Sequence, residues 1–275
     1  MKQTSLENED FLGEINNQNI LKKKSENEVN NTIKSVLDKI KKNVLLMIHK
    51  KEYDNALKVI TKDLRIFYQE KRDYDRFNIT PYTDDLIKKY NLNSYVNASE
   101  IIHEKITYFP CQFPKKRYSE NFLNFLEKTG VSLIISLIPI EEDDYFTGIY
   151  LKNKIEHKDS KGNVIFYKEE YEINNKNYIR LRYLRWEDFD VPDKEEFGFF
   201  YNEYKGIRSL HKNIAVHCLA GVGRTGVTIM YDILCNMNYV DEGIFLDTLL
   251  MLRQSRPCLV YTAEQLKFLA DIFIA

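Results

Sequence analysis

A cysteine, two glycines and an arginine lie within a few residues of one another in the last third of this 275-residue chain. The stretch reads IAVHCLAGVGRTGV and starts at Ile214, so the cysteine is Cys218 and the arginine is Arg224. An apolar run before the cysteine is typical of a buried strand, the glycines allow a tight turn, and the apolar pattern from Val227 indicates a helix. We therefore expect a strand, a loop and a helix N-terminus.

A loop of this kind can bind an anion and activate a thiol. Its backbone N–H groups and the positive end of the helix dipole point at one place, which attracts negative charge. The same field favours the thiolate, which is the nucleophilic form of cysteine. Arg224 adds a planar pair of N–H donors that fits two phosphate oxygens. The pattern predicts phosphoryl transfer to Cys218, with the phosphate held by Leu219, Ala220, Gly221, Val222 and Gly223.

The spacing of Cys218 and Arg224, with His217 before and Thr225 after, resembles the phosphate-binding loop of the cysteine-based protein tyrosine phosphatases. That family usually has serine where this chain has Leu219. The resemblance implies that Cys218 is the nucleophile and that Arg224 holds the phosphoryl oxygens. It also implies that Thr225 hydrogen-bonds the departing thiolate and that His217 orients the loop.

A second segment, RYLRWEDFDVPD, resembles the mobile acid loop of the same family. Trp186 and Asp188 match the family pattern, whereas Glu187 replaces the usual proline and Asp190 the usual glycine. The phenolate that leaves from phosphotyrosine needs a proton from a nearby acid. The resemblance assigns this task to Asp188, with Asp190 and Glu187 as alternatives and Trp186 beside the substrate.

A third segment, RDYDRFNITPYTD, resembles the family's phosphotyrosine-recognition loop. Phe77 then takes the place of the aromatic residue that stacks on the substrate ring, and Pro81 and Tyr82 take the places of the Pro-Tyr pair. An aromatic wall there makes a pocket too deep for phosphoserine. Tyr74 is the alternative if the register differs.

A fourth segment, RQSRPCLVYTAEQLKF, resembles the family's glutamine loop. Gln265 matches the second glutamine and Thr262 the threonine, but Tyr261 stands in place of the first glutamine. Family enzymes use that first glutamine to place the water that hydrolyses the cysteinyl phosphate. We therefore expect Gln265 to be catalytic, Tyr261 to border the substrate, and the second half-reaction to be the step most affected.

Composition limits the partners. The chain has 40 Lys and Arg against 41 Asp and Glu, and this balance argues against nucleic acid as a partner. Its four cysteines show no metal-ligand spacing, and the implied chemistry needs no metal or other cofactor. No run of 18 apolar residues suggests a membrane span. We expect a cytoplasmic protein, or a secreted effector that acts in a host cytosol; the oligomeric state is left open.

The apolar pattern predicts one α/β domain with a mixed central β-sheet flanked by helices. Residues 1–27 are polar and are expected to be a flexible segment, followed by a phosphatase domain over 28–275 whose first part, 28–70, forms two amphipathic helices. Strands are expected at 94–98, 106–109 and 131–137, followed by three antiparallel strands separated by turns at 159–163 and 174–177. Helices are expected at 122–128, 193–211, 227–239, 241–253 and 263–274.

Hydrolysis of phosphotyrosine in proteins through a cysteinyl-phosphate intermediate is the function that these segments indicate. Two alternatives remain. A module that binds phosphotyrosine without turnover is favoured by Glu187 and Tyr261. A dual-specificity or phosphoinositide phosphatase is disfavoured, because Leu219, Ala220 and Val222 offer no cations for further phosphates.

Overall fold

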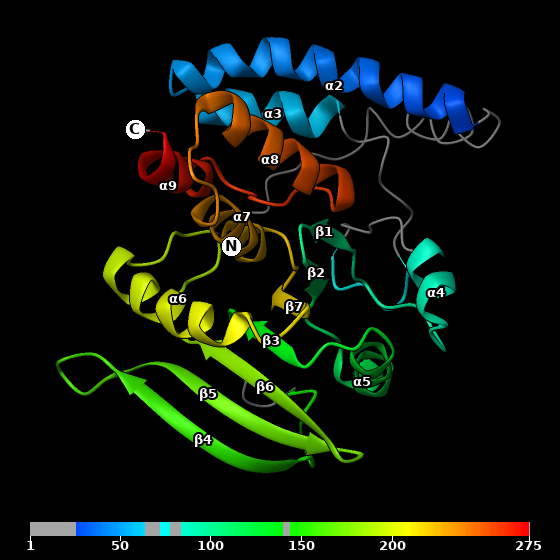
Figure 1. Ribbon diagram of the computed structural model, residues 1–275, viewed down its shortest axis with the longest axis vertical. Helices are drawn as coiled ribbons and strands as arrows, with labels where there is room; N and C mark the ends of the chain where they lie inside the picture. The colour runs from blue at the N-terminus through cyan, green and yellow to red at the C-terminus, as the bar shows by residue number, and fades with distance from the viewer. Residues whose placement is uncertain (1–25, 64–71, 78–83, 140–143, 275) are drawn as a thin grey trace.

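Seven strands form one mixed sheet at the centre of the computed structural model, which describes residues 26–63, 72–77, 84–139 and 144–274 (Figure 1). In spatial order the strands are β1 (Ile101–His103), β2 (Ile106–Gln112), β7 (Asn213–Cys218), β3 (Leu133–Ser136), β6 (Lys176–Tyr183), β5 (Val164–Ile173) and β4 (Tyr150–Lys158). The four middle strands are parallel, whereas β1, β5 and β4 pair antiparallel. Parallel strands end at one edge of a sheet, where α/β proteins place their ligands.

Helices flank the sheet, as the sequence predicts. Those described are α2 (Glu26–His49), α3 (Tyr53–Asp63), α4 (Asp84–Tyr90), α5 (Ser119–Lys128), α6 (Lys194–Arg208), α7 (Gly223–Cys235), α8 (Glu242–Ser255) and α9 (Ala263–Phe273), with a short 3₁₀ turn, η2 (Lys116–Tyr118), before α5. Neighbouring residues of β2 show how the faces divide. Tyr108 hydrogen-bonds Asp232 of α7, while Phe109 packs on Phe125 of α5. Because strand side chains alternate, α7 and α5 cover opposite faces.

One buried carboxylate fixes α7 behind the sheet. Asp232 accepts hydrogen bonds from the hydroxyls of Tyr108 at 2.6 Å, Tyr201 at 2.8 Å and Tyr204 at 2.8 Å, and from the guanidinium of Arg208 at 2.7 Å. Four donors satisfy the lone pairs of a carboxylate that is fully buried. Strand β2, helix α6 and helix α7 are therefore joined at one point, and the N-terminus of α7 is held at the sheet edge.

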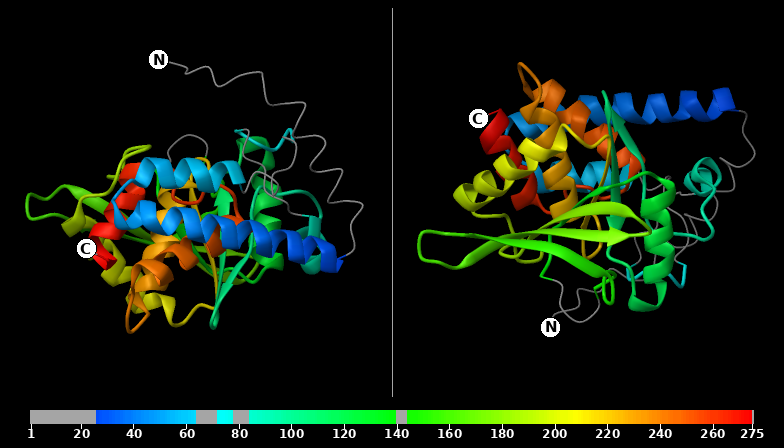
Figure 2. Two further views of the ribbon diagram at one scale, coloured as in Figure 1. Left: turned by 90° about the horizontal axis from the view of Figure 1, so that it is seen from above. Right: turned by 60° about the horizontal axis from the view of Figure 1, so that its bottom comes forward.

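The two N-terminal helices pack on the C-terminal ones (Figures 1 and 2). Ile40, Val44 and Ile48 of α2 recur at four-residue intervals and are buried in the same core as the sheet. Arg253 of α8 donates from Nη1 to Oγ1 of Thr61 in α3 at 2.9 Å. The two predicted helices extend to residue 70, and residues 64–70 lie outside the described residues, as do residues 1–25.

Three details of the predicted elements were wrong. Residues 94–98 are not a strand; only Ala98 forms a single bridge to Cys111, because the backbone turns at Asn97, where the N–H of Ala98 donates to the carbonyl oxygen of Val96 at 2.8 Å. The strand at this edge is instead β1. Helix α7 begins at Gly223, not at Val227, because the loop backbone enters the helix without an intervening turn.

Candidate active site

Cys218 is the last residue of β7, in the middle of the parallel part of the sheet. The chain then passes through residues 219–222 into α7, and the N–H of Gly221 donates to Sγ of Cys218 at 3.3 Å. Gly221 has φ +72°, and a Cβ there would lie 2.1 Å from the carbonyl oxygen of Cys111. Only glycine fits this backbone, which turns a peptide N–H toward the sulfur. Leu219 and Ala220 are partly exposed at the loop rim, and Val222 is buried.

Arg256 holds the outer side of this loop. It is fully buried, and it donates to the carbonyl oxygens of Gly221 at 2.7 Å and Ala220 at 3.0 Å, and to Oδ1 of Asn97 at 2.7 Å. A peptide whose carbonyl points outward presents its N–H group inward, on the side of Cys218. Arg256 therefore organises the anion-binding side of the loop. The sequence did not indicate this role, since Arg256 stands inside the segment that resembles the glutamine loop.

The same network reaches the predicted recognition segment. Nδ2 of Asn97 donates to Oδ1 of Asp75 at 2.6 Å, and the N–H of Arg76 donates to Oε1 of Gln112 at 2.7 Å. Phe77, the next residue, keeps 38% of its surface exposed, whereas Tyr74 is 4% exposed. An exposed ring suits a substrate contact, so Phe77 fits the predicted role and Tyr74 belongs to the core. The predicted partners Pro81 and Tyr82 lie outside the described residues.

Arg224 lies in the first turn of α7 and is only 4% exposed. Its Nη1 donates to the carbonyl oxygen of Trp186 at 2.7 Å, and its Nη2 donates to Oδ1 of Asp188 at 2.9 Å. Its Nε is buried and has no hydrogen-bond partner among the described residues. The acid loop therefore lies against the arginine of the cysteine loop, and one guanidinium donor is left for a ligand.

Asp188 is the acid-loop carboxylate that contacts Arg224. The side chain of Asp190 instead accepts from the backbone N–H of Val191 at 2.8 Å. Trp186 is 2% exposed, and its indole N–H donates to the carbonyl oxygen of Asp190 at 2.8 Å, which closes the loop on itself. The geometry thus brings the predicted acid, rather than its alternatives, to the arginine.

His217 and Thr225 flank the loop from the interior. The ring of His217 lies 2.9 Å from the hydroxyl of Tyr145 and 3.3 Å from the carbonyl oxygen of Cys218. Burial lowers the pKa of His217 to about 3, so this ring is neutral at physiological pH. Oγ1 of Thr225 is buried, and within the described part of the chain it has no hydrogen-bond partner. The threonine hydroxyl is therefore available for a new bond, and the ring of His217 contacts the start of the loop.

Gln265 is 1% exposed and uses its amide for structure. Its Oε1 accepts from the N–H groups of Tyr261 at 3.0 Å and Thr262 at 3.3 Å, and its Nε2 donates to the carbonyl oxygen of Asp190 at 3.2 Å. The bond from Thr262, together with a bond from the N–H of Gln265 to Oγ1 of Thr262 at 3.2 Å, forms a capping box at the start of α9. Gln265 therefore joins the glutamine loop to the acid loop, a contact that the sequence did not indicate.

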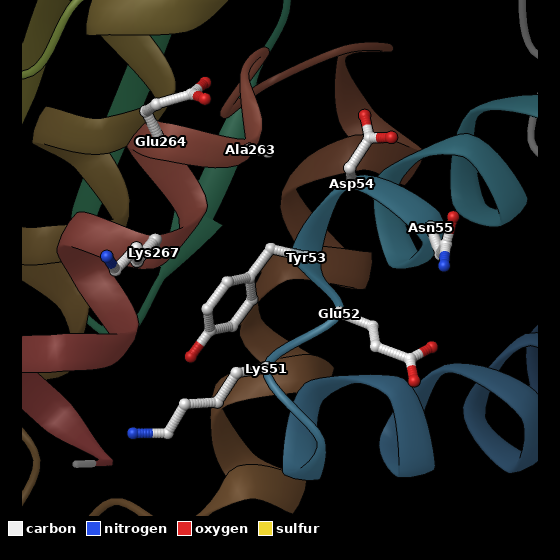
Figure 3. Close-up of a pocket in the computed structure, with 8 residues that line it drawn as sticks. All are labelled: Lys51, Glu52, Tyr53, Asp54, Asn55, Ala263, Glu264 and Lys267. Carbon is white, nitrogen blue, oxygen red and sulfur yellow. The ribbon is translucent and has the colours of Figure 1, made fainter.

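A hollow of about 440 Å³ lies apart from this site, between the starts of α3 and α9 (Figure 3). Its lining mixes the cations Lys51 and Lys267 with the acids Glu52, Asp54 and Glu264. It holds no nucleophile and no concentrated charge of one sign. The residues predicted to react are instead those around Cys218, where Asp188 of the acid loop contacts Arg224.

Comparison with known proteins decides the family. The sequence profile described as Protein-tyrosine phosphatase matches residues 69–275, which is most of the chain. The chain belongs to the protein-tyrosine phosphatase family. No helix in the described part of this phosphatase-family chain is both long enough and apolar enough to cross a membrane.

Curated relatives carry the same family name. Tyrosine-protein phosphatase 1 of Caenorhabditis elegans is 25% identical over 228 residues, which is 74% of this chain and 22% of that protein. Human tyrosine-protein phosphatase non-receptor type 14 is 23% identical over 71% of this chain and 20% of its own length. The chain thus spans about a fifth of the length of these relatives.

Solved structures confirm the fold. The catalytic domain of human protein tyrosine phosphatase non-receptor type 18 superposes with a TM-score of 0.57 at 22% identity, over 71% of this chain and 81% of that one. A structure of PTPN18 in complex with HER2 phosphopeptides gives a TM-score of 0.64 at 20% identity, over 87% of this chain and 97% of that one. The mixed sheet with flanking helices is the phosphatase fold.

Proposed function

We propose that this chain hydrolyses phosphotyrosine in proteins through a cysteinyl-phosphate intermediate. The observation that carries the proposal is the contact of Arg224 with Asp188 beside the loop that begins at Cys218. Nucleophile, phosphate-binding arginine and proton donor come from β7, α7 and the loop before α6. Binding of phosphopeptides by PTPN18, a solved relative, supports the same class of substrate here.

In the first half-reaction the Cys218 thiolate attacks phosphorus. The S–P bond forms, the P–O bond to tyrosine breaks, and Asp188 gives its proton to the leaving oxygen. Arg224 and the loop N–H groups hold the equatorial oxygens, on which the transition state spreads its charge. The guanidinium Nε of Arg224 supplies a donor for this purpose. Phe77 supports the aromatic ring of the substrate.

In the second half-reaction water attacks phosphorus and the S–P bond breaks. Asp188, now a carboxylate, accepts the proton of the water, and inorganic phosphate leaves. The hydroxyl of Thr225 donates to the thiolate as it departs. No metal or other cofactor takes part in this scheme. Gln265 is held by Asp190 and the start of α9, so it is not free to place the water, and this second half-reaction is the slower one.

Phosphate release from a phosphotyrosyl peptide, compared with a phosphoseryl peptide and a soluble phosphoinositide, tests the proposal. We expect release from the phosphotyrosyl peptide alone, and none from a Cys218→Ser variant that still binds this peptide. Binding by the wild type without release would show the alternative, a phosphotyrosine-binding module. Release from all three substrates would show a phosphatase of broader specificity.

A further inference from the structure

Phe189, the residue directly after Asp188, has an unfavourable backbone conformation and an exposed ring. Its φ is +65°, in the left-handed region that is unfavourable for a residue with a side chain, and its ring keeps 63% of its surface exposed. Little core packing is available to stabilise this backbone. Its neighbours are the ring of Tyr261, with centroids 6.0 Å apart at 52°, and Oγ1 of Thr262, which donates to the Phe189 carbonyl oxygen at 3.4 Å.

Tyr261 is itself held firmly in place. The preceding residue, Val260, has φ +58°, which is rare for a β-branched side chain. Its N–H donates to the carbonyl oxygen of Val222 at 3.2 Å, and its own carbonyl oxygen accepts from Nη2 of the buried Arg253 at 2.6 Å. The strained backbone before Tyr261 is therefore anchored to the cysteine loop and to α8, and it presents a ring that is 44% exposed.

The contact matters because the hydrogen bond to Asp188 itself comes from Arg224, whose guanidinium also faces the ligand. Nη2 of Arg224 is bonded to Asp188 in this structure. A phosphate in the loop competes for the same guanidinium and brings a like charge beside the carboxylate. The pair of rings does not involve Arg224 and is unaffected by that competition. It lies one residue from Asp188.

We propose that Tyr261 is a positioning residue whose ring, through Phe189, holds the acid loop over Cys218 when an anion occupies the site. This inference rests on the proposed function in that Asp188 is taken as the acid. The ring carries the effect, whereas the hydroxyl does not. A tyrosine at this position thus does different work from the glutamine that the family usually has there.

Trp186 gives a readout that does not depend on turnover. It is the single tryptophan of the chain, it is buried, and its indole bonds within the acid loop. Acrylamide quenching of its fluorescence, with orthovanadate in the site, therefore reports exposure of this loop. We expect Tyr261→Gln to increase the fraction of molecules with an open acid loop about 2- to 10-fold, the range expected for loss of one aromatic pair. Tyr261→Phe, the matched control, should quench like the wild type.

Phe189→Leu tests the contact from the other side. It should raise acrylamide quenching of Trp186 as Tyr261→Gln does, and Trp186 in the double variant should be no more exposed than in either single variant. With phenyl phosphate, whose leaving group needs the acid, Tyr261→Gln should lower kcat/KM more than with 4-nitrophenyl phosphate. The proposal is wrong if Trp186 is quenched equally in Tyr261→Gln and the wild type, or equally in Tyr261→Phe and Tyr261→Gln. A chain without phosphatase activity would overturn the proposed function and leave the quenching result to decide this one.

Discussion

Replacing Arg256 by lysine should disorganise the loop around Cys218 from its outer side. Arg256 donates three hydrogen bonds, to Gly221, Ala220 and Asn97, at 2.7, 3.0 and 2.7 Å. A hydrogen bond from a charged donor contributes about 1.5–3 kcal/mol, and a lysine ammonium in this position can keep one of the three. Loss of two predicts a decrease of about 3–6 kcal/mol in the free energy of unfolding.

Two measurements separate the fold from the site. For a chain of this size each kcal/mol lowers Tm by about 2–4 °C, which differential scanning calorimetry resolves easily. Binding of orthovanadate, an oxyanion of phosphate shape, reports the loop itself. We expect Arg256→Lys to lower both Tm and the affinity for orthovanadate, because the freed carbonyl groups no longer fix the inward direction of the N–H groups.

Arg208→Lys is the matched control. Arg208 donates to Asp232 at 2.7 Å and to Asn236 at 3.1 Å, near the C-terminal end of α7 and away from the cysteine loop at its N-terminus, and three tyrosine hydroxyls also hold Asp232. It should lower Tm while orthovanadate binds as to the wild type. Arg256→Lys with a lowered Tm and an unchanged orthovanadate affinity would refute the argument, since Arg256 would then support the fold alone.

Four other predictions concern the site and its loops. Asp188→Asn should lower kcat for phenyl phosphate by roughly 10²–10⁴ while Asp190→Asn stays near the wild type, and the reverse ranking would move the acid to Asp190. Because Gln265 is bonded to the acid loop, hydrolysis of the cysteinyl phosphate should be slow. Stopped-flow mixing with 4-nitrophenyl phosphate should then show a burst of 4-nitrophenol near one equivalent, and linear release from the start would contradict slow hydrolysis of this intermediate. Burial lowers the pKa of His217 to about 3, so the unfolded chain binds a proton below about pH 6.5 that the folded one does not, and the free energy of unfolding should fall by about 1.4 kcal/mol per pH unit as the pH drops from 6.5. Urea unfolding of His217→Gln between pH 6 and 5 should lack this part of the slope, and equal slopes would count against a neutral buried ring. Cys258 has φ +63°, so the free energy of unfolding, measured with urea, should be about 1 kcal/mol higher for Cys258→Gly than for Cys258→Ala, the reverse of the usual order.

Local chemistry made the cysteine loop predictable. Strand, loop and helix follow one another in a few residues, so the positions of Cys218 and Arg224 depend on short-range geometry that spacing describes well. The same holds for the hairpin strands β4, β5 and β6, whose turns are marked by glycine and asparagine. The general arrangement, a mixed sheet with helices on both faces, follows from these alternating segments.

Contacts distant in sequence were not predictable. The bond from Arg256 to Asn97 joins residues 159 positions apart, and nothing in the spacing of either segment indicates it. Asn97 was assigned to a strand because its neighbours have strand propensity, but the backbone turns there, with the N–H of Ala98 bonded to the carbonyl oxygen of Val96. The choice between Tyr74 and Phe77 likewise required burial, because both are aromatic and only three residues apart.

The hydrogen bond between Arg253 and Thr61 affects where this chain can be cut for expression. The family profile begins at residue 69, so a fragment designed on that boundary would lack α2 and α3. It would expose the apolar surface that Ile40, Val44 and Ile48 now cover, and it would remove the hydroxyl that Nη1 of Arg253 binds. Arg253 also holds the backbone before Tyr261. A fragment that starts near residue 26 keeps this support, whereas one that starts at residue 69 would give an aggregation-prone protein with a loosened active-site rim.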